Sequence, residues 1–194
     1  LPPAVLRQHI WPESDAQFCP HCLTDGNYHR LAWLPQRVSV CLVHCCLLVK
    51  GCSTCGHKLK IADVVESCCG HCAFDLRTSP TISVAEDAFG LLSQHIIQGW
   101  LRISTANRVD QAKLPSQPDF ILYQIVYGLH RAIRTIQRRW DYLHDPFDVE
   151  TATSVFPCDK KSELTPFKLY VLYATAFKAL LRWPHGFFEF LNAF

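Results

Sequence analysis

The sequence predicts a small mixed tandem of zinc-ribbon and zinc-finger type, with short strands and two structural zinc sites, followed by an all-α helical domain. Two observations predict this fold class. Between residues 19 and 72, Cys and His recur as four pairs, and each pair has two residues between its members. After residue 82, apolar residues recur at helical spacing instead. The chain therefore divides into an N-terminal helix or arm (1–18), a tandem zinc-binding module (19–76) and a helical domain (82–194).

The composition is that of a folded protein. Of the 194 residues, 49% are hydrophobic and 19% are charged. The formal net charge is only +2, so charge gives no argument for a strongly basic nucleic-acid-binding module. No apolar run reaches the length of a membrane span, and we expect no membrane contact. The lack of methionine and the first residue, Leu1, indicate a piece of a longer protein.

The four pairs supply eight metal ligands: Cys19 and Cys22, Cys41 and His44, Cys52 and Cys55, and Cys69 and Cys72. Zn²⁺ is held by four such ligands in a tetrahedron, and a two-residue gap lets one tight turn place two of them on the same ion. Eight ligands therefore predict two structural zinc ions. The 11 cysteines could instead form disulfides, but the odd count and the interposed His favour metal and a reducing compartment.

The sequence leaves the grouping of the pairs open. Sequential grouping gives a site of three cysteines and one histidine from the first two pairs and a site of four cysteines from the last two. An interleaved cross-brace would instead join the first pair to the third. The repeated spacing Cys55-x-x-x-Leu59 and Cys72-x-x-x-Leu76 favours sequential grouping. Cys68 is an alternative ligand to Cys69. The remaining cysteines are interpreted as buried small apolar residues, and three histidines as polar loop residues or donors to the ligands (Cys45, Cys46, Cys158; His21, His57, His71).

The expected elements of the zinc module are short. A helix over residues 3–10 precedes it, and Asp25-Gly26 forms a turn. Strands are expected over residues 28–33, 37–40 and 46–49, and Ile61 to Val65 is a short apolar segment. Gly56 follows the third pair, where a positive φ is often needed.

Three helices and the start of a fourth are expected after residue 82. The first runs over 84–103, because Ser83 and Glu86 form a capping box, and its buried face carries Phe89, Leu92, Ile96 and Trp100. The second covers 119–144. The third begins at Thr165-Pro166 and ends before Trp183-Pro184, and a fourth starts at His185. Four arginines of the second helix form a basic patch, which is either a solvated face or a contact for phosphates or an acidic partner (Arg131, Arg134, Arg138, Arg139).

The sequence holds no motif of a known catalytic centre. No Gly-rich phosphate loop, HExxH or GxSxG occurs. Four ligands for each zinc leave no open coordination position, so the sites are structural and we expect a protein that is not an enzyme.

The stretch around the ligands resembles the TniQ family, which includes TnsD. The resemblance lies in F-C-P-H-C-L at 18–23, in Y-H-R-L-A-W at 28–33, in V-C-L-V-H at 40–44, in C-S-T-C-G at 52–56 and in C-G-H-C-A-F-D-L at 69–76. Arg30 and Trp33 between the pairs point to this family more than the cysteines do. A weaker similarity lies at 180–191, which looks like the W-P-x-x-F segment that follows the zinc region in longer members, near their helix-turn-helix parts.

The resemblance implies an adaptor in transposition. TniQ-like proteins link a chosen DNA target, or an RNA-guided CRISPR effector bound to it, to the AAA+ ATPase TnsC, which then recruits the transposase. It implies a cytoplasmic bacterial protein with the two zinc ions at the ligands above. Independently of the resemblance, we expect the partner surfaces to involve the zinc platform with Arg30 and the helix from Arg131 to Arg139. The alternative is a zinc-ribbon regulator that binds DNA or RNA without a transposition partner.

Overall fold

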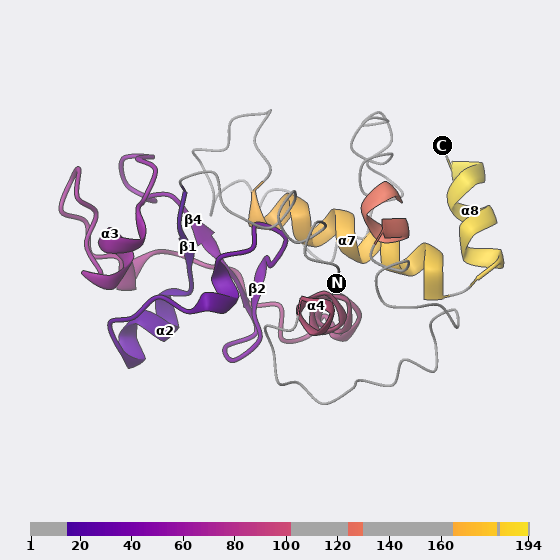
Figure 1. Cartoon of the computed structure of the whole chain (residues 1–194), viewed down its shortest axis with the longest axis horizontal. Helices are drawn as coiled ribbons and strands as arrows, with labels where there is room; N and C mark the ends of the chain where they lie inside the picture. The colour runs from indigo at the N-terminus through magenta and orange to yellow at the C-terminus, as the bar shows by residue number, and fades with distance from the viewer. Residues whose placement is uncertain (1–14, 102–123, 130–164, 182, 194) are drawn as a thin grey trace.

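The computed structural model describes residues 15–101, 124–129, 165–181 and 183–193. Short strands and small helices of the cysteine-rich region lie at one end of the molecule, and the longer helices α4, α7 and α8 lie at the other (Figure 1). Short strands followed by helices are what the sequence predicts. The predicted helix 3–10 lies outside the described residues, as does most of the predicted helix 119–144, of which residues 124–129 are helical.

Two antiparallel pairs of two-residue strands order the cysteine-rich region. β1 (Gln17–Phe18) pairs with β4 (Val49–Lys50), and β2 (Val40–Cys41) pairs with β3 (Cys46–Leu47). Gln17 and Phe18, assigned to the arm from sequence, therefore form part of the first strand pair. The predicted strand 46–49 is split at Leu48, whose main-chain N–H donates to the carbonyl of Ser39 at 2.8 Å.

The predicted strand 28–33 is wrong, because the structure has a 3-10 helix, η1 (Leu31–Trp33), at its end. The predicted strand 37–40 is also reduced, since only its last residue, Val40, lies in a strand. One side chain explains the loop between them. The buried amide of Gln17 donates to the carbonyls of Trp33, Pro35 and Val38 at 2.8, 3.0 and 2.8 Å. These bonds take up carbonyls that a strand would direct to a neighbouring strand.

Three further short helical elements complete this region. α2 (Pro20–Asp25) begins with proline at its first position, where the missing N–H costs nothing. α3 (Ile61–Val65) occupies the predicted apolar segment, and η2 (Leu76–Thr78) follows the last Cys pair, with the side chain of Asp75 accepting from the N–H of Arg77.

The first long helix starts later than predicted. α4 (Ala88–Trp100) is capped by Asp87, whose Oδ1 accepts from the N–H of Gly90 at 2.9 Å, and not by Ser83. Ser83 instead forms a β-bridge with Cys46. The N–H of Val84 donates to the carbonyl of Cys45 at 2.7 Å, so the chain before α4 runs beside β3. This pairing removes residues 83–85 from the helix.

The polar side of α4 is buried as well as the apolar side. Of the predicted buried face, Ile96 and Trp100 are buried, but Phe89 and Leu92 are only half-buried. Gln94 and Gln98 are also buried, because the Oε1 of Gln94 accepts from the N–H of Ser39 at 3.2 Å and the Nε2 of Gln98 donates to the carbonyl of Val40 at 3.0 Å. Two glutamine side chains of α4 thus make the main-chain hydrogen bonds to Ser39 and Val40 that a neighbouring strand would otherwise make.

The last two helices confirm the sequence prediction. α7 (Pro166–Leu181) follows Thr165, whose hydroxyl accepts from the N–H of Lys168 at 3.3 Å, and α8 (His185–Ala193) follows Trp183-Pro184. α7 packs on α4 and on α8. Among the described residues, no helix is long and apolar enough to cross a membrane.

The main apolar cluster includes buried residues from both regions, from Ala16 to Phe190. The predicted division near residue 80 thus separates two stretches that share a core. Buried Arg37 joins them, because its guanidinium lies over the ring of Tyr127 at 4.2 Å and donates to the hydroxyl of Tyr173 at 3.0 Å.

Candidate metal centres

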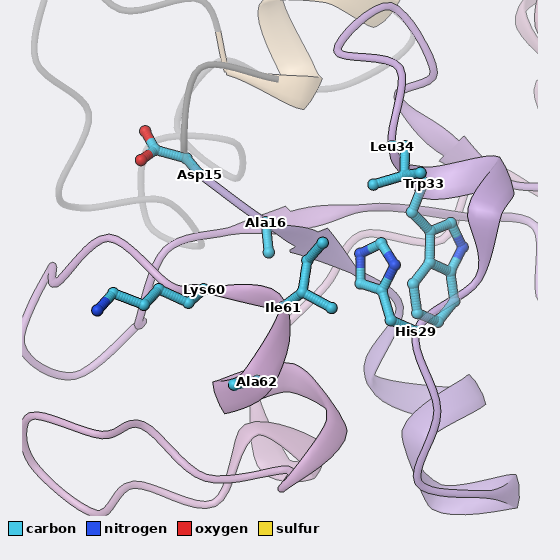
Figure 2. A pocket seen from close by; sticks show the side chains of 8 residues that line it. All are labelled: Asp15, Ala16, His29, Trp33, Leu34, Lys60, Ile61 and Ala62. Atoms are coloured by element: carbon cyan, nitrogen blue, oxygen red, sulfur yellow. The ribbon is translucent and has the colours of Figure 1, made fainter. Parts of the chain in front are cut away.

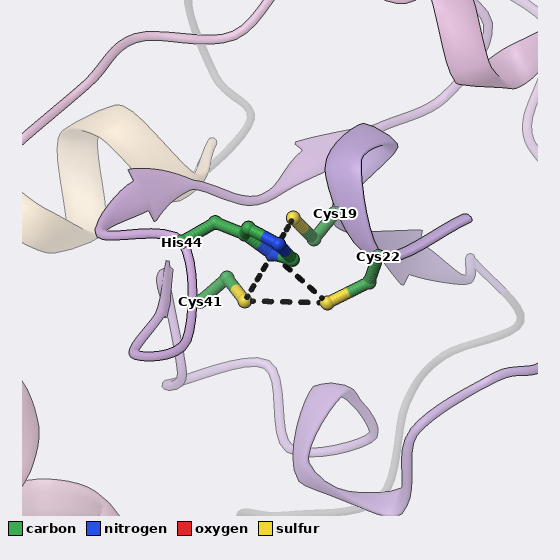
Figure 3. A group of neighbouring side chains, drawn as sticks. All are labelled: Cys19, Cys22, Cys41 and His44. Atoms are coloured by element: carbon green, nitrogen blue, oxygen red, sulfur yellow. Dashed lines mark hydrogen bonds between the residues drawn. The ribbon is translucent and has the colours of Figure 1, made fainter. Parts of the chain in front are cut away.

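The first two Cys/His pairs converge on one point (Figure 3). The sulfurs of Cys19, Cys22 and Cys41 and a ring nitrogen of His44 all lie within 4.8 Å of one another. The Nδ1 of His44 is 3.6, 3.3 and 3.8 Å from these sulfurs, in that order, and the sulfurs of Cys22 and Cys41 are 3.6 Å apart. The three cysteines are buried and His44 is half-buried.

These distances fit a tetrahedral metal ion. With metal–sulfur bonds of about 2.3 Å and metal–nitrogen bonds of about 2.0 Å, ligand atoms at tetrahedral corners lie roughly 3.6 to 3.8 Å apart. Three thiolates and one imidazole are also a donor set typical of structural zinc. The first cluster is therefore compatible with one bound ion.

The last two pairs form a second cluster of the same dimensions. The sulfurs of Cys52, Cys55, Cys69 and Cys72 lie within 4.8 Å of one another. The sulfur of Cys52 is 3.6 Å from that of Cys72, and the sulfur of Cys55 is 3.8 Å from that of Cys69. Cys55 and Cys72 are exposed, unlike any cysteine of the first cluster. The grouping in the structure is thus sequential, and Cys69 rather than Cys68 joins it.

Three of the four pairs share one backbone turn. The residue after the second ligand has a positive φ each time, with 46° at Cys45, 68° at Gly56 and 58° at Ala73. In the second cluster, the N–H of Gly56 donates to the carbonyl of Cys52 at 2.8 Å, and the N–H of Ala73 donates to that of Cys69 at 2.8 Å. The two pairs with the repeated spacing, Cys55 to Leu59 and Cys72 to Leu76, thus have the same hydrogen-bonded turn, and Leu59 and Leu76 are both fully buried.

The first pair is held differently, by a helix. Cys19 is the N-cap of α2 and Cys22 lies in its first turn, so both side chains reach the same face of one turn. The spacing of Cys19 and Cys22 predicted a tight turn at this pair. That prediction was wrong, because the structure has a short helix there. Pro20 explains it, because proline is pre-organised for the first helical position.

The equivalent turns at Gly56 and Ala73 allow a paired test. The left-handed conformation costs a residue with a Cβ about 1 kcal/mol, and glycine is nearly free of this cost. We expect Ala73→Gly to raise the free energy of unfolding of the metal-loaded protein by up to about 1 kcal/mol, and Gly56→Ala to lower it by a similar amount. Denaturant unfolding at fixed free metal concentration measures both. Shifts of the same sign would contradict the assigned backbone.

The carboxylate of Asp25 contacts His44 of the first cluster, on the side of the ring that faces away from the sulfurs. The Nε2 of His44 lies 3.2 Å from the Oδ2 of Asp25, at the end of α2, while Nδ1 faces the sulfurs. A carboxylate in this position fixes the ring orientation and the tautomer of a metal-binding histidine. The sequence placed Asp25 only in a turn. Asp25 lies three residues after Cys22 in the same short helix, a spacing that could have suggested a shared face.

The Asp25 contact predicts a site-specific loss of affinity. We expect Asp25→Ala to weaken metal binding at the first cluster by about 10- to 100-fold, because the ring loses its acceptor, and to leave the second cluster unchanged. Competition with a chromophoric chelator resolves the two sites, and the second cluster serves as the control within the same molecule. Equal weakening of both sites would show general unfolding instead.

The environments of individual thiols differ without metal. The neighbouring sulfur of Cys19 and then burial raise the pKa of the Cys41 thiol to about 12. Burial also acts to raise the pKa of Cys69, but main-chain N–H groups of Cys72 and His71 donate to its sulfur, and the net pKa falls to about 7. Main-chain donors of this kind stabilise the thiolate that a metal requires.

Other predicted residues near the clusters are placed as follows. Cys46 is buried with its sulfur 3.5 Å from that of Cys19, Cys45 is half-buried, and Cys158 lies outside the described residues. The rings of His57 and His71 stack at 4.9 Å, and the ring of His21 lies 5.5 Å from that of His44. None of these three histidines belongs to a cluster of ligands in the described part of the chain.

The predicted partner-binding arginines are placed only in part. The guanidinium of Arg30 lies 5.0 Å from the ring centre of Tyr28 and donates to its hydroxyl. Burial raises the pKa of the Cys22 thiol, and the nearby charge of Arg30 opposes this rise. This charge therefore compensates thiolates of the first cluster. The remaining arginines, Arg131, Arg134, Arg138 and Arg139, lie outside the described residues.

Comparison with known proteins adds no relative to this picture. No protein-family model, no curated protein and no solved structure matches the chain. What the chain shows of its chemistry is therefore two sets of four Cys/His donors, each closed around a space that fits one metal ion.

Proposed function

We propose that this protein is a zinc-stabilised adaptor in transposition target selection, which links target DNA or an RNA-guided effector to the AAA+ ATPase TnsC, and through it to the transposase. The observation that carries the structural part is the pair of clusters with four donors each. Four protein ligands leave no position for a substrate or water, so the zinc ions hold the fold and perform no chemistry. A rigid surface without a catalytic centre is suited to binding partners.

The transposition part of the proposal rests on the sequence around the ligands. Arg30 and Trp33, between the first two pairs, are the residues that carry the resemblance to the TniQ family. Trp33 is 2% exposed and belongs to the same apolar cluster as Cys19, Cys22 and Cys41, and the charge of Arg30 opposes the rise in the pKa of Cys22 that burial causes. Both residues therefore lie in the part of the fold that surrounds the first cluster.

A nucleic-acid-binding regulator is the second candidate. Tyr28 is 40% exposed, and the guanidinium of Arg30 lies over its ring. An exposed aromatic ring next to an arginine can stack on an unpaired base. In this case binding would weaken steeply with salt and would need no ATPase.

A binding assay with the zinc-loaded full chain separates the two. The chain is immobilised and offered its cognate TnsC, with and without target DNA and ATP. The adaptor proposal expects TnsC to be retained and Arg30→Ala to reduce retention. Arg77→Ala is the matched control, because Arg77 is an exposed arginine of the same region whose guanidinium pairs with Asp75. Zinc content is measured for both variants.

Three outcomes decide the proposal. Retention of TnsC that survives Arg77→Ala but not Arg30→Ala supports it, provided that both variants keep two zinc ions. Salt-sensitive DNA binding without any retention of TnsC supports the regulator and overturns the adaptor. Hydrolysis or redox turnover that needs the bound zinc would overturn both.

A further inference from the structure

The two metal centres differ in how far their cysteines are exposed to solvent. The three cysteines of the first cluster are at most 3% exposed. In the second cluster, Cys52 and Cys69 are equally buried, at 2% and 1%, but Cys55 and Cys72 are exposed. The residues around these two cysteines, 54–58 and 70–73, are all exposed as well. The second cluster therefore has one side open to solutes in water.

The surroundings of the sulfur atoms show the same difference. Few protein atoms lie around the sulfurs of Cys69 and Cys72. The sulfurs of Cys19 and Cys41 are instead surrounded by the fold. Access matters because a cysteine that binds a metal is a thiolate, and the thiolate is the form that oxidants attack. The second cluster combines thiolates with access, whereas the first has thiolates without access.

Each exposed sulfur of the second cluster lies near a buried sulfur of the other Cys pair. The sulfur of Cys72 is 3.6 Å from that of Cys52, and the sulfur of Cys55 is 3.8 Å from that of Cys69. A disulfide needs its two sulfurs about 2.0 Å apart. A small movement of two side chains thus closes either pair, and a buried thiolate is in place to react with an exposed cysteine once that cysteine is oxidised.

We propose that Cys55 and Cys72 are oxidation sites, at which a peroxide converts thiolates of the second cluster into disulfides with Cys69 and Cys52. The exposed thiolate attacks one oxygen of the peroxide, the O–O bond breaks, and a sulfenic acid and a hydroxide ion form. The buried thiolate then attacks the sulfenic sulfur, so that the S–S bond forms, the S–O bond breaks and a second hydroxide ion leaves. The two sulfurs lose two electrons, and these reduce hydrogen peroxide to the two hydroxide ions.

One disulfide would disrupt the second cluster and the segment that it holds. Two thiolates remain, which are too few to hold a structural zinc ion, and residues 52–76 lose the folding free energy that the metal provides. This segment also contacts α2, because η2 packs on α2 and the hydroxyl of Ser67 donates to the side chain of Asn27 at 3.1 Å. The oxidation sites depend on the exposure and spacing of four sulfurs, and not on which partner the protein binds.

Hydrogen peroxide in slight excess tests the sites on the zinc-loaded full chain. A chromophoric chelator follows the released zinc, N-ethylmaleimide blocks the remaining thiols, and tryptic peptides are analysed by mass spectrometry. We expect the first equivalent of zinc to be released at least about tenfold faster than the second. Cleavage after Lys58 and Lys60 separates the two Cys pairs, so a disulfide between the pairs joins two peptides. A thiol reductant with added zinc should restore the original amide spectrum.

Substitution by histidine removes the exposed thiolates without removing a metal ligand. The double variant Cys55→His/Cys72→His has Cys-x-x-His spacing in both pairs, as the pair that ends at His44 has. The residue after the second ligand has a positive φ in all three turns. This variant should still bind two zinc ions, and the fast release should disappear. Cys68→Ser is the matched control, because Cys68 is a half-buried thiol outside both clusters, and it should leave the release unchanged.

Three results would overturn the proposal. A disulfide of the first cluster at the first release of zinc, such as Cys19 with Cys46, whose sulfurs are 3.5 Å apart, would place the sensitive site there. Disulfides within the pairs of the second cluster would leave the peptides unlinked and refute the assigned partners. Fast release from the zinc-loaded double variant would show that the exposed thiolates do not react. If the double variant binds only one zinc ion, the peptide map of the unsubstituted chain decides alone.

Discussion

Chelation of the bound metal is expected to unfold residues 15–78 of this protein. The region has four strands of two residues each, and α2 and α3 have six and five residues. Elements of this length are not stable alone in water. Ligand cysteines are themselves part of the main apolar cluster, with Cys19 and Cys22 fully buried. Binding of each zinc ion therefore provides on the order of 10 kcal/mol of folding free energy that no other contact replaces.

The measurement combines metal analysis with amide spectra. The folded chain should contain two equivalents of zinc, and removal by a strong chelator should collapse the dispersed amide resonances of residues 15–78. Addition of zinc should restore them. Cys52→Ser, which removes a buried ligand of the second cluster, should reduce the content to one equivalent. Well below two equivalents in the folded protein, or a dispersed spectrum after complete chelation, would contradict the zinc assignment.

The two clusters should differ in how fast they lose metal. The cysteines of the first cluster are buried, whereas Cys55 and Cys72 of the second are exposed. A chelator can approach an exposed thiolate directly, so the second cluster should be emptied first. The order of amide losses during chelation, residues 52–76 before residues 19–44, would follow from exposure alone.

The parts of this structure that the sequence predicted are those with local signals. The gap of two residues within each pair and the turns with a positive φ after His44, Cys55 and Cys72 are local, so the two clusters could be anticipated. α7 could be anticipated for the same reason, because Thr165-Pro166 begins it and Trp183-Pro184 follows it. In each case the residues that define the element lie within one or two turns of it.

The wrong predictions arose where a residue that is distant in the sequence determines the local backbone conformation. Residues 28–33 have the apolar and aromatic pattern of a strand, but Gln17 holds the loop after them through three carbonyls. In the sequence, both Ser83 and Asp87 are possible N-caps of α4. The bridge of Ser83 with Cys46 excludes a helix that begins after Ser83, and Asp87 caps the helix instead by accepting from the N–H of Gly90. The local sequence does not distinguish these two caps.

The features of the structure other than the metal ligands could not be predicted from local sequence patterns either. Asp25 contacts His44 across 19 positions of the chain. Residues near 15, 29–34 and 60–62 line one cavity, although they are far apart in the sequence (Figure 2). Such features follow from tertiary packing and need the structure.

The contact between α4 and α7 leads to the second large predicted effect, at Gly90. Asp87 accepts from the N–H of Gly90 through Oδ1 and from the hydroxyl of Tyr170 through Oδ2, at 2.9 and 2.5 Å. Tyr170 is fully buried on α7, so its ring and hydroxyl lie directly against the first turn of α4. A Cβ on Gly90 would approach the hydroxyl and ring of Tyr170 and the carboxylate of Asp87 to well under 3.0 Å.

We therefore expect Gly90→Ala to destabilise the protein by about 3 kcal/mol, because the helices must separate or Tyr170 must leave its place. The higher helix propensity of alanine, worth up to about 1 kcal/mol, does not offset this. Gly99→Ala is the matched control on the same helix. Gly99 is exposed and a Cβ there meets nothing within 4 Å, so only the propensity gain remains.

Thermal unfolding of the zinc-loaded variants measures the difference. For a chain of this size, about 3 kcal/mol lowers Tm by roughly 6 to 12 °C, whereas Gly99→Ala should leave Tm unchanged or raise it by a few degrees. Tyr170→Phe in the Gly90→Ala background should recover only part of the loss, since the ring carbon that bears the hydroxyl also stands within 3.0 Å of the new Cβ. If Gly90→Ala were as stable as Gly99→Ala, Tyr170 could not lie against this turn of α4, and the contact that joins the two helices would have to be placed elsewhere.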